Sequence, residues 1–432
     1  MDYKSNIQFR KETLTRLLYS IEENEKRIIE ALYKDFKKPE FEAVLTETNY
    51  VIGDLKQTIK NIKCWAKPKR VLPSILNFPS SDYIYSEPYG KVLVIAPWNY
   101  PFQLALCPLI AAVAAGNSVV LKPSELTPNT SSIIAEIISK VFSKNHVEVI
   151  EGGVEVSQNL LAQKWDYIFF TGSVAVGKIV AKAAAEYMTP VTLELGGKNP
   201  FIVCDDADID QAVNWAVLSA FSNAGQRCAA GSRILVFRSI YEKFRKKIIT
   251  KTNSLKLGID LDCDLGPVIN MRQYENILNA IKNAKKEGGK ILSGGRKPTN
   301  IKLINGYYIQ PTIIENLRRD SYLSTNEIFG PVVTLHVVED IQDALNFSNS
   351  SEYGLTAAIH TRNLDRAVWF AQKIRSGTVN INIGTFGSEP HMPFGGFGLS
   401  GNGTREPGVE ALDVYSELKN ISFLVRENLI NT

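Results

Sequence analysis

Histidine is scarce in this chain of 432 residues, and its distribution bears on metal chemistry. The four histidines lie far apart, and no Cys-x-x-Cys or His-Glu-x-x-His spacing occurs; they are His146, His336, His360 and His391. Protein zinc sites draw on clustered histidine and cysteine ligands. The sequence therefore predicts no metal site.

Cysteine is also infrequent, and its pattern does not suggest disulfides. The five cysteines are odd in number and widely spaced: Cys64, Cys107, Cys204, Cys228 and Cys263. Disulfides are typical of secreted proteins, so we expect reduced thiols in a cytoplasmic protein. The polar and charged start, residues 1–10, lacks the apolar core of a secretory signal.

Long hydrophobic runs and a strong net charge are both missing. The most apolar stretch, Phe102 to Gly116, is interrupted by Pro108 and is shorter than the roughly 20 residues that cross a bilayer, so we expect a buried helix. The formal charge is only +4 and is spread along the chain, which favours neither a nucleic-acid nor a membrane partner. The length predicts two large domains.

Hydrophobic periodicity predicts the order of these domains. Helical spacing between about Phe9 and Ala66 predicts two or more amphipathic helices. The segment Tyr83–Pro97, with a turn at residues 87–90, is typical of a β-hairpin. From Ala111 to Glu194 short β-branched runs alternate with helical segments, which indicates a parallel doubly wound sheet. A second α/β alternation, from about Pro200 to Gly384, predicts a cleft between two bodies. The expected strands include Val119–Leu121, Val147–Ile150, Tyr167–Phe170, Val191–Leu195, Ile234–Val236 and Val379–Ile383.

The strongest chemical signal is a glutamate followed 34 positions later by a cysteine. Glu194 opens the motif Glu-Leu-Gly-Gly-Lys at the end of an expected strand, where the glycines let a ligand approach the backbone. Cys228 lies among small and polar residues, which suits a sulfur that faces a cavity. Thiolates attack carbonyl carbons, and Arg227 or nearby N–H groups would favour the thiolate. A single cysteine is more often an inert buried thiol, but the joint pattern favours catalysis.

The two motifs resemble the signature of the aldehyde dehydrogenase superfamily. Further motifs of that family follow in the right order, beginning at Pro97, Lys122, Phe170, Glu327 and Pro393: Pro-Trp-Asn-Tyr-Pro, Lys-Pro-Ser-Glu, Phe-Thr-Gly-Ser, Glu-Ile-Phe-Gly-Pro and Pro-Phe-Gly-Gly. The resemblance runs from about Leu14 to Phe423. Much of the chain is most similar to the class-3 branch, whereas Ser400–Gly403 departs towards the general family pattern.

The resemblance implies NAD(P)-dependent oxidation of an aldehyde to the carboxylic acid. Cys228 would add to the aldehyde and form a thiohemiacetal, which becomes a thioester when hydride leaves. Asn99 would donate a hydrogen bond to the developing oxyanion. Glu194 would activate the water that hydrolyses the thioester, which favours a free acid as product. Taken alone, Asn99 is as well explained as a turn residue between prolines.

The resemblance also assigns cofactor-binding residues. Gly172, Ser173 and Gly177 open a helix where backbone N–H groups would meet a pyrophosphate, although the Gly-x-Gly-x-x-Gly fingerprint is absent. Lys122 and Glu125 would reach the adenosine ribose, and Glu125 would repel a 2′-phosphate, which favours NAD while leaving NADP possible. Three more residues are assigned to the cofactor by the resemblance: Leu195, Glu327 and Phe329. Tyr100 and Phe394 match positions that line the substrate tunnel and suit apolar or aromatic aldehydes.

We expect a Rossmann-type cofactor domain, an α/β catalytic domain and a small β oligomerisation arm. The cofactor domain comprises residues 1–80 and 96–195, the catalytic domain 196–393, and the arm with the C-terminal segment 81–95 and 394–432. An unpaired ribbon needs a partner, so a homodimer or homotetramer is expected. Two alternatives remain open: a cysteine-dependent esterase on the same scaffold, and a catalytically retired binding protein.

Overall fold

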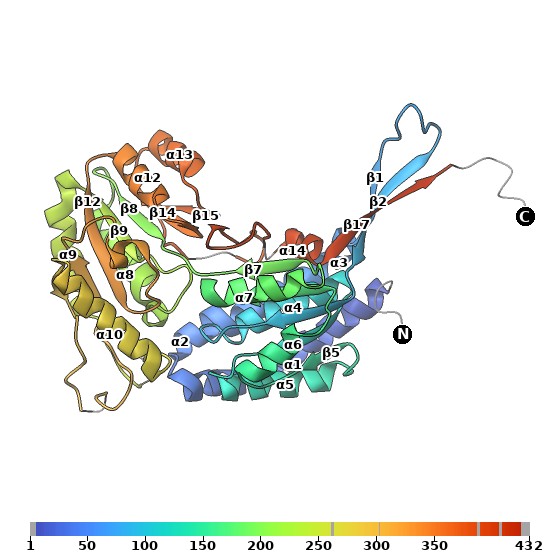
Figure 1. Ribbon diagram of the computed structural model, residues 1–432, viewed down its shortest axis with the longest axis horizontal. Helices are drawn as coiled ribbons and strands as arrows, with labels where there is room; N and C mark the ends of the chain where they lie inside the picture. The colour runs from blue at the N-terminus through green and yellow to red at the C-terminus, as the bar shows by residue number, and fades with distance from the viewer. Residues whose placement is uncertain (1–5, 261–262, 302, 387–388, 406–407, 425–432) are drawn as a thin grey trace, which may run out of the picture.

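The chain forms two α/β bodies and a projecting β arm (Figure 1). A computed structural model describes residues 6–260, 263–301, 303–386, 389–405 and 408–424. Each body is built around a largely parallel sheet with its own buried clusters of aliphatic and aromatic side chains. This is the aldehyde dehydrogenase-like fold class expected from the sequence.

The N-terminal segment forms the predicted amphipathic helices. Helix α1 (Ile7–Phe36) begins at Asn6, whose side chain accepts a hydrogen bond from the Phe9 N–H at 2.9 Å. It ends at Lys37, which has a left-handed φ of 56°. The chain then continues through two short turns into the next long helix: α2 (Glu40–Ala43), the π-helical turn η1 (Val44–Thr48) and α3 (Asn49–Trp65). Helix α1 packs against α3 and α5 and covers one face of the first sheet.

The first body contains a five-stranded parallel sheet in the order β5-β4-β3-β6-β7. Its elements are β3 (Lys91–Ile95), α4 (Gln103–Ala115), β4 (Ser118–Lys122), α5 (Pro128–Val141), β5 (Val147–Val149), α6 (Val154–Leu161), β6 (Tyr167–Thr171), α7 (Val174–Ala185) and β7 (Val191–Glu194). The predicted alternation and the predicted buried helix are both confirmed. The strand order reverses between β3 and β6, and such a switch point is where doubly wound sheets bind ligands.

The β-hairpin predicted for Tyr83–Pro97 is wrong. Strand β2 (Ser81–Pro88) pairs with β1 (Lys69–Val71) and β17 (Ser416–Phe423), whereas β3 pairs in parallel with β4 and β6. Residues 92–95 are buried and all apolar, so they suit a sheet covered on both faces, and β2 is only half-buried. Residues 91–95 therefore lie in the cofactor-side sheet and not in the arm.

The second body contains a seven-stranded sheet in the order β10-β11-β12-β9-β8-β14-β15, in which only the β10–β11 pairing is antiparallel. Its strands are β8 (Pro200–Val203), β9 (Arg233–Phe237), β10 (Lys290–Ser293), β11 (Thr312–Glu315), β12 (Val332–Val338), β14 (Thr356–His360) and β15 (Thr378–Ile381). The helices and 3-10 turns between them are α8 (Ile209–Phe221), η2 (Ser222–Gly225), η3 (Arg238–Ile240), α9 (Tyr241–Asn253), α10 (Met271–Lys286), α11 (Tyr322–Thr325), α12 (Ile341–Asn349) and α13 (Leu364–Lys373). The predicted second alternation is confirmed.

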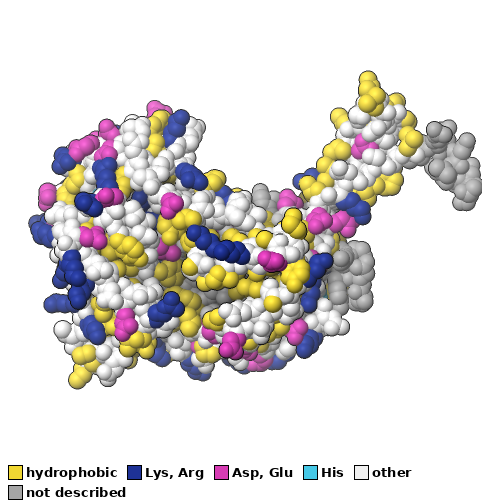
Figure 2. Space-filling model, viewed as in Figure 1, with side chains coloured by type: hydrophobic (Ala, Val, Ile, Leu, Met, Phe, Trp, Pro, Cys, Tyr) yellow, Lys and Arg dark blue, Asp and Glu magenta, His cyan; other side chains and the backbone are white. Residues whose placement is uncertain are grey.

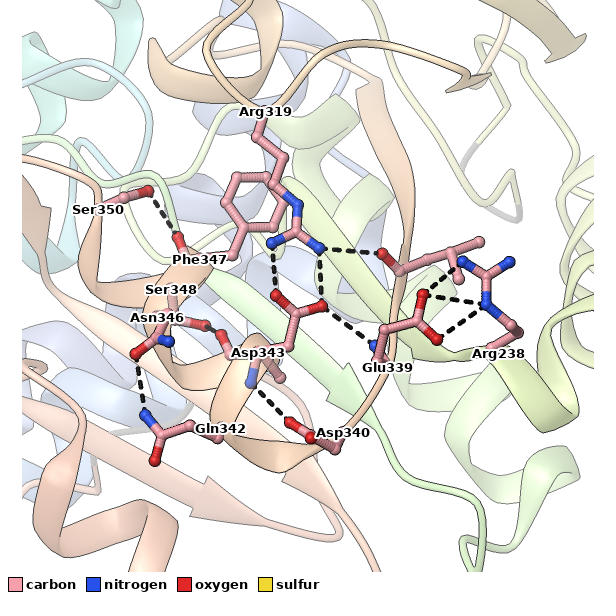
Figure 3. A network of polar contacts seen from close by, with 12 residues as sticks. Arg238, Arg319, Glu339, Asp340, Gln342, Asp343, Asn346, Phe347, Ser348 and Ser350 are labelled. Carbon is pink, nitrogen blue, oxygen red and sulfur yellow. Dashed lines mark hydrogen bonds and ion pairs between the residues drawn. The ribbon is translucent and has the colours of Figure 1, made fainter.

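A polar network fixes α12 next to β12 (Figure 3). Asp340 caps α12 by accepting a hydrogen bond from the Asp343 N–H at 2.8 Å. Arg319 grips the Asp343 carboxylate with two nitrogens at 2.6 and 2.8 Å, and its guanidinium lies over the Phe347 ring. A two-pronged contact of this kind fixes orientation as well as distance. The network orders the outer layer of this body.

Strands β1, β2 and β17 form an arm that projects away from both bodies (Figure 1). Strand β17, from the C-terminal segment, pairs antiparallel with β2, which lies within the segment expected to form the arm. The loop after β1 exposes four large apolar side chains by 76–94%: Leu72, Ile75, Leu76 and Phe78. Figure 2 shows apolar side chains gathered on this arm. Helix α14 (Val409–Val414) lies near the arm. Strands β13 (Tyr353–Gly354) and β16 (Phe397–Gly398) form a separate short antiparallel pair. No helix within the described ranges is long and apolar enough to span a membrane.

Candidate active site

A cavity of about 630 Å³ brings together residues from both bodies. Cys228 and Glu194, which are far apart in sequence, both line it. Tyr100 and Phe394, predicted as pocket residues, also line it. Most of the remaining wall is apolar, with contributions from Leu45, Leu104, Pro108, Phe169, Trp215, Ile383 and Phe386. The predicted nucleophile thus faces an open, largely apolar space and is not sealed in a core.

The loop that carries Cys228 has an unusual backbone. Asn223, Ala224 and Gly225 have consecutive positive φ angles of 52°, 53° and 69°, a conformation that non-glycine residues rarely adopt. A Cβ on Gly225 would lie 2.1 Å from the Gly330 carbonyl oxygen. The segment is therefore bent sharply and packs against the residues just before β12. This bend places Cys228 at the cavity wall.

Two buried amides hold this loop in place. The Asn199 Nδ2 donates to the carbonyl oxygens of Cys228 and Ala230 at 2.7 and 2.9 Å. The Gln226 side chain donates to the Pro267 carbonyl at 3.2 Å and accepts from the Ile269 N–H at 2.8 Å. Sequence analysis missed Asn199 and Gln226. Both are adjacent to the recognised motifs, and this position in the sequence is the signal that could have indicated a role near the cysteine loop.

Asn99 follows β3 at the switch point of the first sheet and lies beside the cysteine loop. Its Nδ2 donates to the Gln226 carbonyl oxygen at 3.2 Å, two residues before Cys228. Its own carbonyl oxygen accepts from the Asn223 Nδ2 at 3.0 Å. Asn99 is 4% exposed. The amide expected to act with Cys228 is therefore joined to that loop by two hydrogen bonds.

Glu194 is the last residue of β7, and backbone contacts fix its position. Its carbonyl oxygen accepts from the Gly172 N–H at 3.0 Å, which joins the ends of β6 and β7. A Cβ on Gly395 would lie 2.9 Å from a carboxylate oxygen of Glu194. The glycine in Pro-Phe-Gly-Gly therefore leaves room for the acid at the cavity wall.

The electrostatics of Cys228 differ from the expectation. Burial raises the pKa of its thiol to about 12, the carboxylate of Glu327 and that of Glu194 also raise it, and Arg227 lowers it. Arg227 and the backbone N–H of Ala229 lower the pKa, in the direction expected, but desolvation outweighs them and the net shift is upward. The guanidinium of Arg227 lies over the Phe386 ring, 4.6 Å from its centroid. At neutral pH the nucleophile is a thiol that needs a base.

Several residues predicted to bind a dinucleotide lie at the carboxyl ends of β4 and β6, which flank β3 in the sheet. Lys122 ends β4, and its Nζ lies 2.7 Å from the Glu125 carboxylate. Although burial acts the other way, the hydrogen bond from Lys122 holds the pKa of Glu125 below its usual value, so this group is a carboxylate. Gly172 and Ser173 follow β6, and Ser173 caps α7. Such a helix start presents N–H groups to a phosphate.

The remaining predicted cofactor residues approach from other sides of the same region. A Cβ on Gly177 would lie 2.7 Å from Leu195, so α7 packs closely on the end of β7. Glu327 comes from the second body, and its carboxylate accepts from the Gly197 N–H at 3.0 Å. A Cβ on Gly196 would lie 2.0 Å from that carboxylate. Phe329 contacts Trp98 edge to face at 5.4 Å. The strand ends and a carboxylate from the facing body thus fit a dinucleotide.

No group of three or more potential metal ligands gathers anywhere in the described part of the chain. The four histidines are dispersed: His146, His336 and His360 are buried, and His391 is exposed. His391, which precedes the Met392-Pro393-Phe394 segment, does not line the cavity.

Comparison with known proteins decides the family. The model of the "Aldehyde dehydrogenase family" matches residues 3–421. The chain belongs to the aldehyde dehydrogenase family. It is 38% identical to the 4,4′-diaponeurosporen-aldehyde dehydrogenase of Staphylococcus aureus, over 97% of this chain and 90% of the relative. It is 36% identical to the mouse "dimeric NADP-preferring" aldehyde dehydrogenase, over 97% and 90% of the two chains.

A family 3 aldehyde dehydrogenase of Arabidopsis thaliana is 36% identical over 96% of this chain and 75% of its own, which supports the class-3 branch. Among solved structures, a betaine aldehyde dehydrogenase of Staphylococcus aureus in complex with NAD⁺ aligns with a TM-score of 0.92 and 34% identity, over 97% of this chain and 83% of that one. The predicted family, fold and enzyme class are confirmed. This aldehyde dehydrogenase is an oxidoreductase that uses NAD(P) to oxidise aldehydes.

Proposed function

We propose that this enzyme oxidises apolar aldehydes to free carboxylic acids with Cys228 as covalent nucleophile, Asn99 as oxyanion donor and Glu194 as general base. The observation that carries the proposal is the convergence of the three residues: Cys228 and Glu194 line one cavity, and Asn99 is hydrogen bonded to the cysteine loop. They come from two bodies and from three separate segments of the chain. A purely structural role would not require Cys228 and Glu194 to line the same cavity.

Cys228 is the group that attacks the aldehyde carbon. Because its pKa is about 12, a base must take the thiol proton as the sulfur–carbon bond forms. Glu194 lines the same cavity and is the base that we assign to this step. The product of the attack is a tetrahedral adduct bound to sulfur, with the negative charge on the former carbonyl oxygen.

Asn99 stabilises that oxygen. An amide group has two N–H donors, and one of them is used in the contact with the Gln226 carbonyl. We assign the other N–H, together with the backbone N–H of Cys228, to the alkoxide. A donor of this kind placed where charge develops contributes roughly 2.7–4 kcal/mol to lowering the barrier.

NAD(P)⁺, when bound, supplies the hydride acceptor that converts the adduct into a thioester. We propose that Gly172, Ser173 and the start of α7 bind its pyrophosphate, that Lys122 and Glu125 bind the adenosine ribose, and that Glu327 binds the second ribose. Phe329 would pack beside the nicotinamide, and Gly177 and Leu195 would form the floor of the cofactor site. The Glu125 carboxylate would repel a 2′-phosphate, so we propose that NAD is preferred and that NADP is also accepted.

Glu194 completes the reaction by activating water. Glu194 first releases the thiol proton to solvent. The water oxygen then attacks the thioester carbon while the Glu194 carboxylate takes its proton, and the carbon–sulfur bond breaks as that proton passes to the leaving sulfur. The carboxylic acid leaves, and Cys228 is restored as the thiol. An acyl transfer to a larger thiol acceptor would not need this base, so Glu194 supports the free acid as product.

The walls of the cavity support an apolar or aromatic aldehyde as substrate. Tyr100 and Phe394 contribute aromatic surface, and most of the other lining side chains are aliphatic or aromatic. Apolar walls bind apolar chains by removing their surface from water. One relative is named for 4,4′-diaponeurosporen-aldehyde and another for betaine aldehyde, so the names of family members refer to different substrates.

We propose that the arm joins two copies of this chain into a homodimer, or dimers into a tetramer. The four exposed apolar side chains at its tip, residues 72–78, support the proposal, because monomers rarely keep such a patch in water. A mouse relative is named dimeric. We also propose the domain division expected from the sequence and a cytoplasmic location. The five free cysteines support the cytoplasmic location.

Two substitutions test the roles of Cys228 and Glu194. We expect Cys228→Ala to abolish NADH formation while NAD binding persists, because the variant lacks the nucleophile but keeps the strand ends. We expect Glu194→Gln to form one equivalent of NADH rapidly and then turn over slowly, because hydrolysis lacks its base. Stopped-flow absorbance measures NADH formation, and isothermal titration calorimetry measures NAD binding. Full steady-state activity in either variant would contradict the assignment.

The two alternatives are separated by simpler measurements. An esterase would hydrolyse esters without NAD(P) at a rate similar to its aldehyde oxidation. A retired binding protein would produce no NADH from any aldehyde in a broad panel. The family comparisons favour neither the esterase nor the retired binding protein.

A further inference from the structure

A fully buried ion pair lies beneath the segment that carries Asn99. Lys38 follows the left-handed end of α1, and Glu47 belongs to the π-helical turn η1. Their side chains are 0% exposed, and the Lys38 Nζ lies 2.5 Å from a Glu47 carboxylate oxygen. Burying two charges is costly, and an apolar pair of the same volume is often as stable or more stable. Stability alone therefore gives a weak explanation for this pair.

Each charge of the pair makes contacts with the residues from Asn99 to Gln103. The Lys38 Nζ donates to the Asn99 carbonyl oxygen at 3.3 Å and lies 4.0 Å from the centroid of the Tyr100 ring. The second carboxylate oxygen of Glu47 accepts from the N–H groups of Phe102 and Gln103 at 3.1 and 2.8 Å. The pair thus holds the segment at both ends, just before α4 begins.

The origin of Glu47 adds to this picture. A π-helical turn is rare and inserts one residue into a helix, and such turns are frequent near functional sites. In this chain the turn η1 lies directly between α2 and α3 and carries a buried glutamate that points to the start of α4. The local backbone irregularity delivers the carboxylate to two N–H groups that α4 itself cannot satisfy.

We infer that Lys38 and Glu47 are positioning residues that hold the Asn99 amide at the distance and angle needed to stabilise the oxyanion. The inference rests on the proposed role of Asn99. Neither residue touches the substrate: Lys38 acts through the Asn99 main chain, and Glu47 acts through the first N–H groups of α4. Because oxyanion stabilisation depends steeply on geometry, a small shift of the amide slows the chemical step.

The double variant Lys38→Met/Glu47→Gln tests this inference without leaving a lone buried charge. The introduced glutamine keeps an acceptor oxygen for α4, and the introduced methionine fills the volume of the lysine stem but cannot donate to Asn99. We expect the rate of the first NADH burst to fall about 10-fold or more. The dissociation constant for NAD, measured by titration calorimetry, should stay within about 2-fold, because the strand ends that bind it are untouched.

A matched control is the partly buried pair Arg245 and Glu315, which joins α9 to β11 with a 2.7 Å contact. Neither residue lines the cavity. Arg245→Met/Glu315→Gln should lower the melting temperature without slowing the burst. If this control slows the burst as much as the Lys38/Glu47 variant, general loosening explains both, and the inference is overturned.

A double-mutant cycle with Asn99→Ala decides whether the pair acts through Asn99. We expect Asn99→Ala alone to slow the burst strongly, and adding Lys38→Met/Glu47→Gln to slow it by less than about 2-fold more. Equal losses in both backgrounds would overturn the inference but leave the proposed function intact. A normal burst in Asn99→Ala would overturn both. Lys38→Met/Glu47→Met, which also leaves no lone buried charge, serves as a second variant if the first double variant does not fold, with the same expectations.

Discussion

The pH dependence of Cys228 alkylation follows directly from its surroundings. Burial and the nearby carboxylates raise the pKa of this thiol to about 12. An acid with a raised pKa stays protonated at neutral pH, and its thiolate fraction grows ten-fold with each pH unit below that value. We therefore expect the free enzyme to react with iodoacetamide at a rate that rises steadily between pH 6 and pH 9 and shows no plateau.

The size of the effect follows from two opposing factors. At pH 7.5 a thiol with a pKa of about 12 is ionised in about 1 molecule in 30,000, against about one tenth for an ordinary cysteine. The more basic thiolate is intrinsically more nucleophilic, which offsets this deficit by about 40-fold. The net expectation is that Cys228 reacts about 80-fold more slowly than an ordinary exposed thiol at pH 7.5.

Mass spectrometry of a tryptic peptide that contains Cys228 measures this rate separately from the other cysteines. Two variants test the cause. Glu327→Gln should speed alkylation because it removes a negative neighbour, and Arg227→Met should slow it because it removes a positive one. A plateau with a midpoint at or below pH 8 in the free enzyme would refute the reasoning. It would mean that the loop supplies more stabilisation to the thiolate than its burial removes.

Three further predictions concern stability, the cysteine loop and assembly. Asp35→Ala removes the carboxylate that accepts hydrogen bonds from the N–H groups of Asn129 and Thr130 at the start of α5. Urea denaturation should show that the free energy of unfolding falls by about 1–2 kcal/mol. No change would mean that water replaces these contacts. Gly197→Ala places a Cβ 2.6 Å from the Cys228 carbonyl oxygen, so kcat should fall about 100-fold, and an unchanged kcat would show that the loop can shift harmlessly. Replacing Leu72, Ile75 and Leu76 by serine should shift the sedimentation coefficient towards that of a monomer, and an unaltered oligomer would place the interface elsewhere.

Much of the fold could be predicted because its patterns are local. The strands of the first sheet are short runs of apolar, β-branched residues between helical segments, and the parallel arrangement follows from that alternation. The hairpin error has a definite cause: a proline–glycine turn between two extended runs looks the same whether or not the strands pair. Strand β2 pairs with β1 and with β17; β17 lies more than 320 residues later, and no local pattern contains that information.

The candidate site divides in the same way. Glu194 and Cys228 were predicted from a pair of short motifs, and Asn99 was predicted from the resemblance of Pro-Trp-Asn-Tyr-Pro to a family motif. Lys38 and Glu47 were missed because a lysine and a glutamate on a helical stretch normally face water, and only the packed structure shows both to be buried. The favourable effect of Arg227 on the thiolate could be expected because the arginine is its sequence neighbour, whereas the larger effect of desolvation on the thiol pKa could not be seen in the sequence.

The chain crosses from one body to the other in very few residues beside the reaction centre. Strand β7 ends at Glu194 and β8 begins at Pro200. Within that crossing, the Gly197 N–H binds Glu327, and Asn199 binds the Cys228 carbonyl. This crossing therefore lies beside the proposed base, the proposed nucleophile and the carboxylate assigned to the ribose. Motion of one body against the other would therefore change the geometry of the reacting groups directly. Solvents or crowding agents that stiffen the molecule should alter turnover before they alter the affinity for substrate.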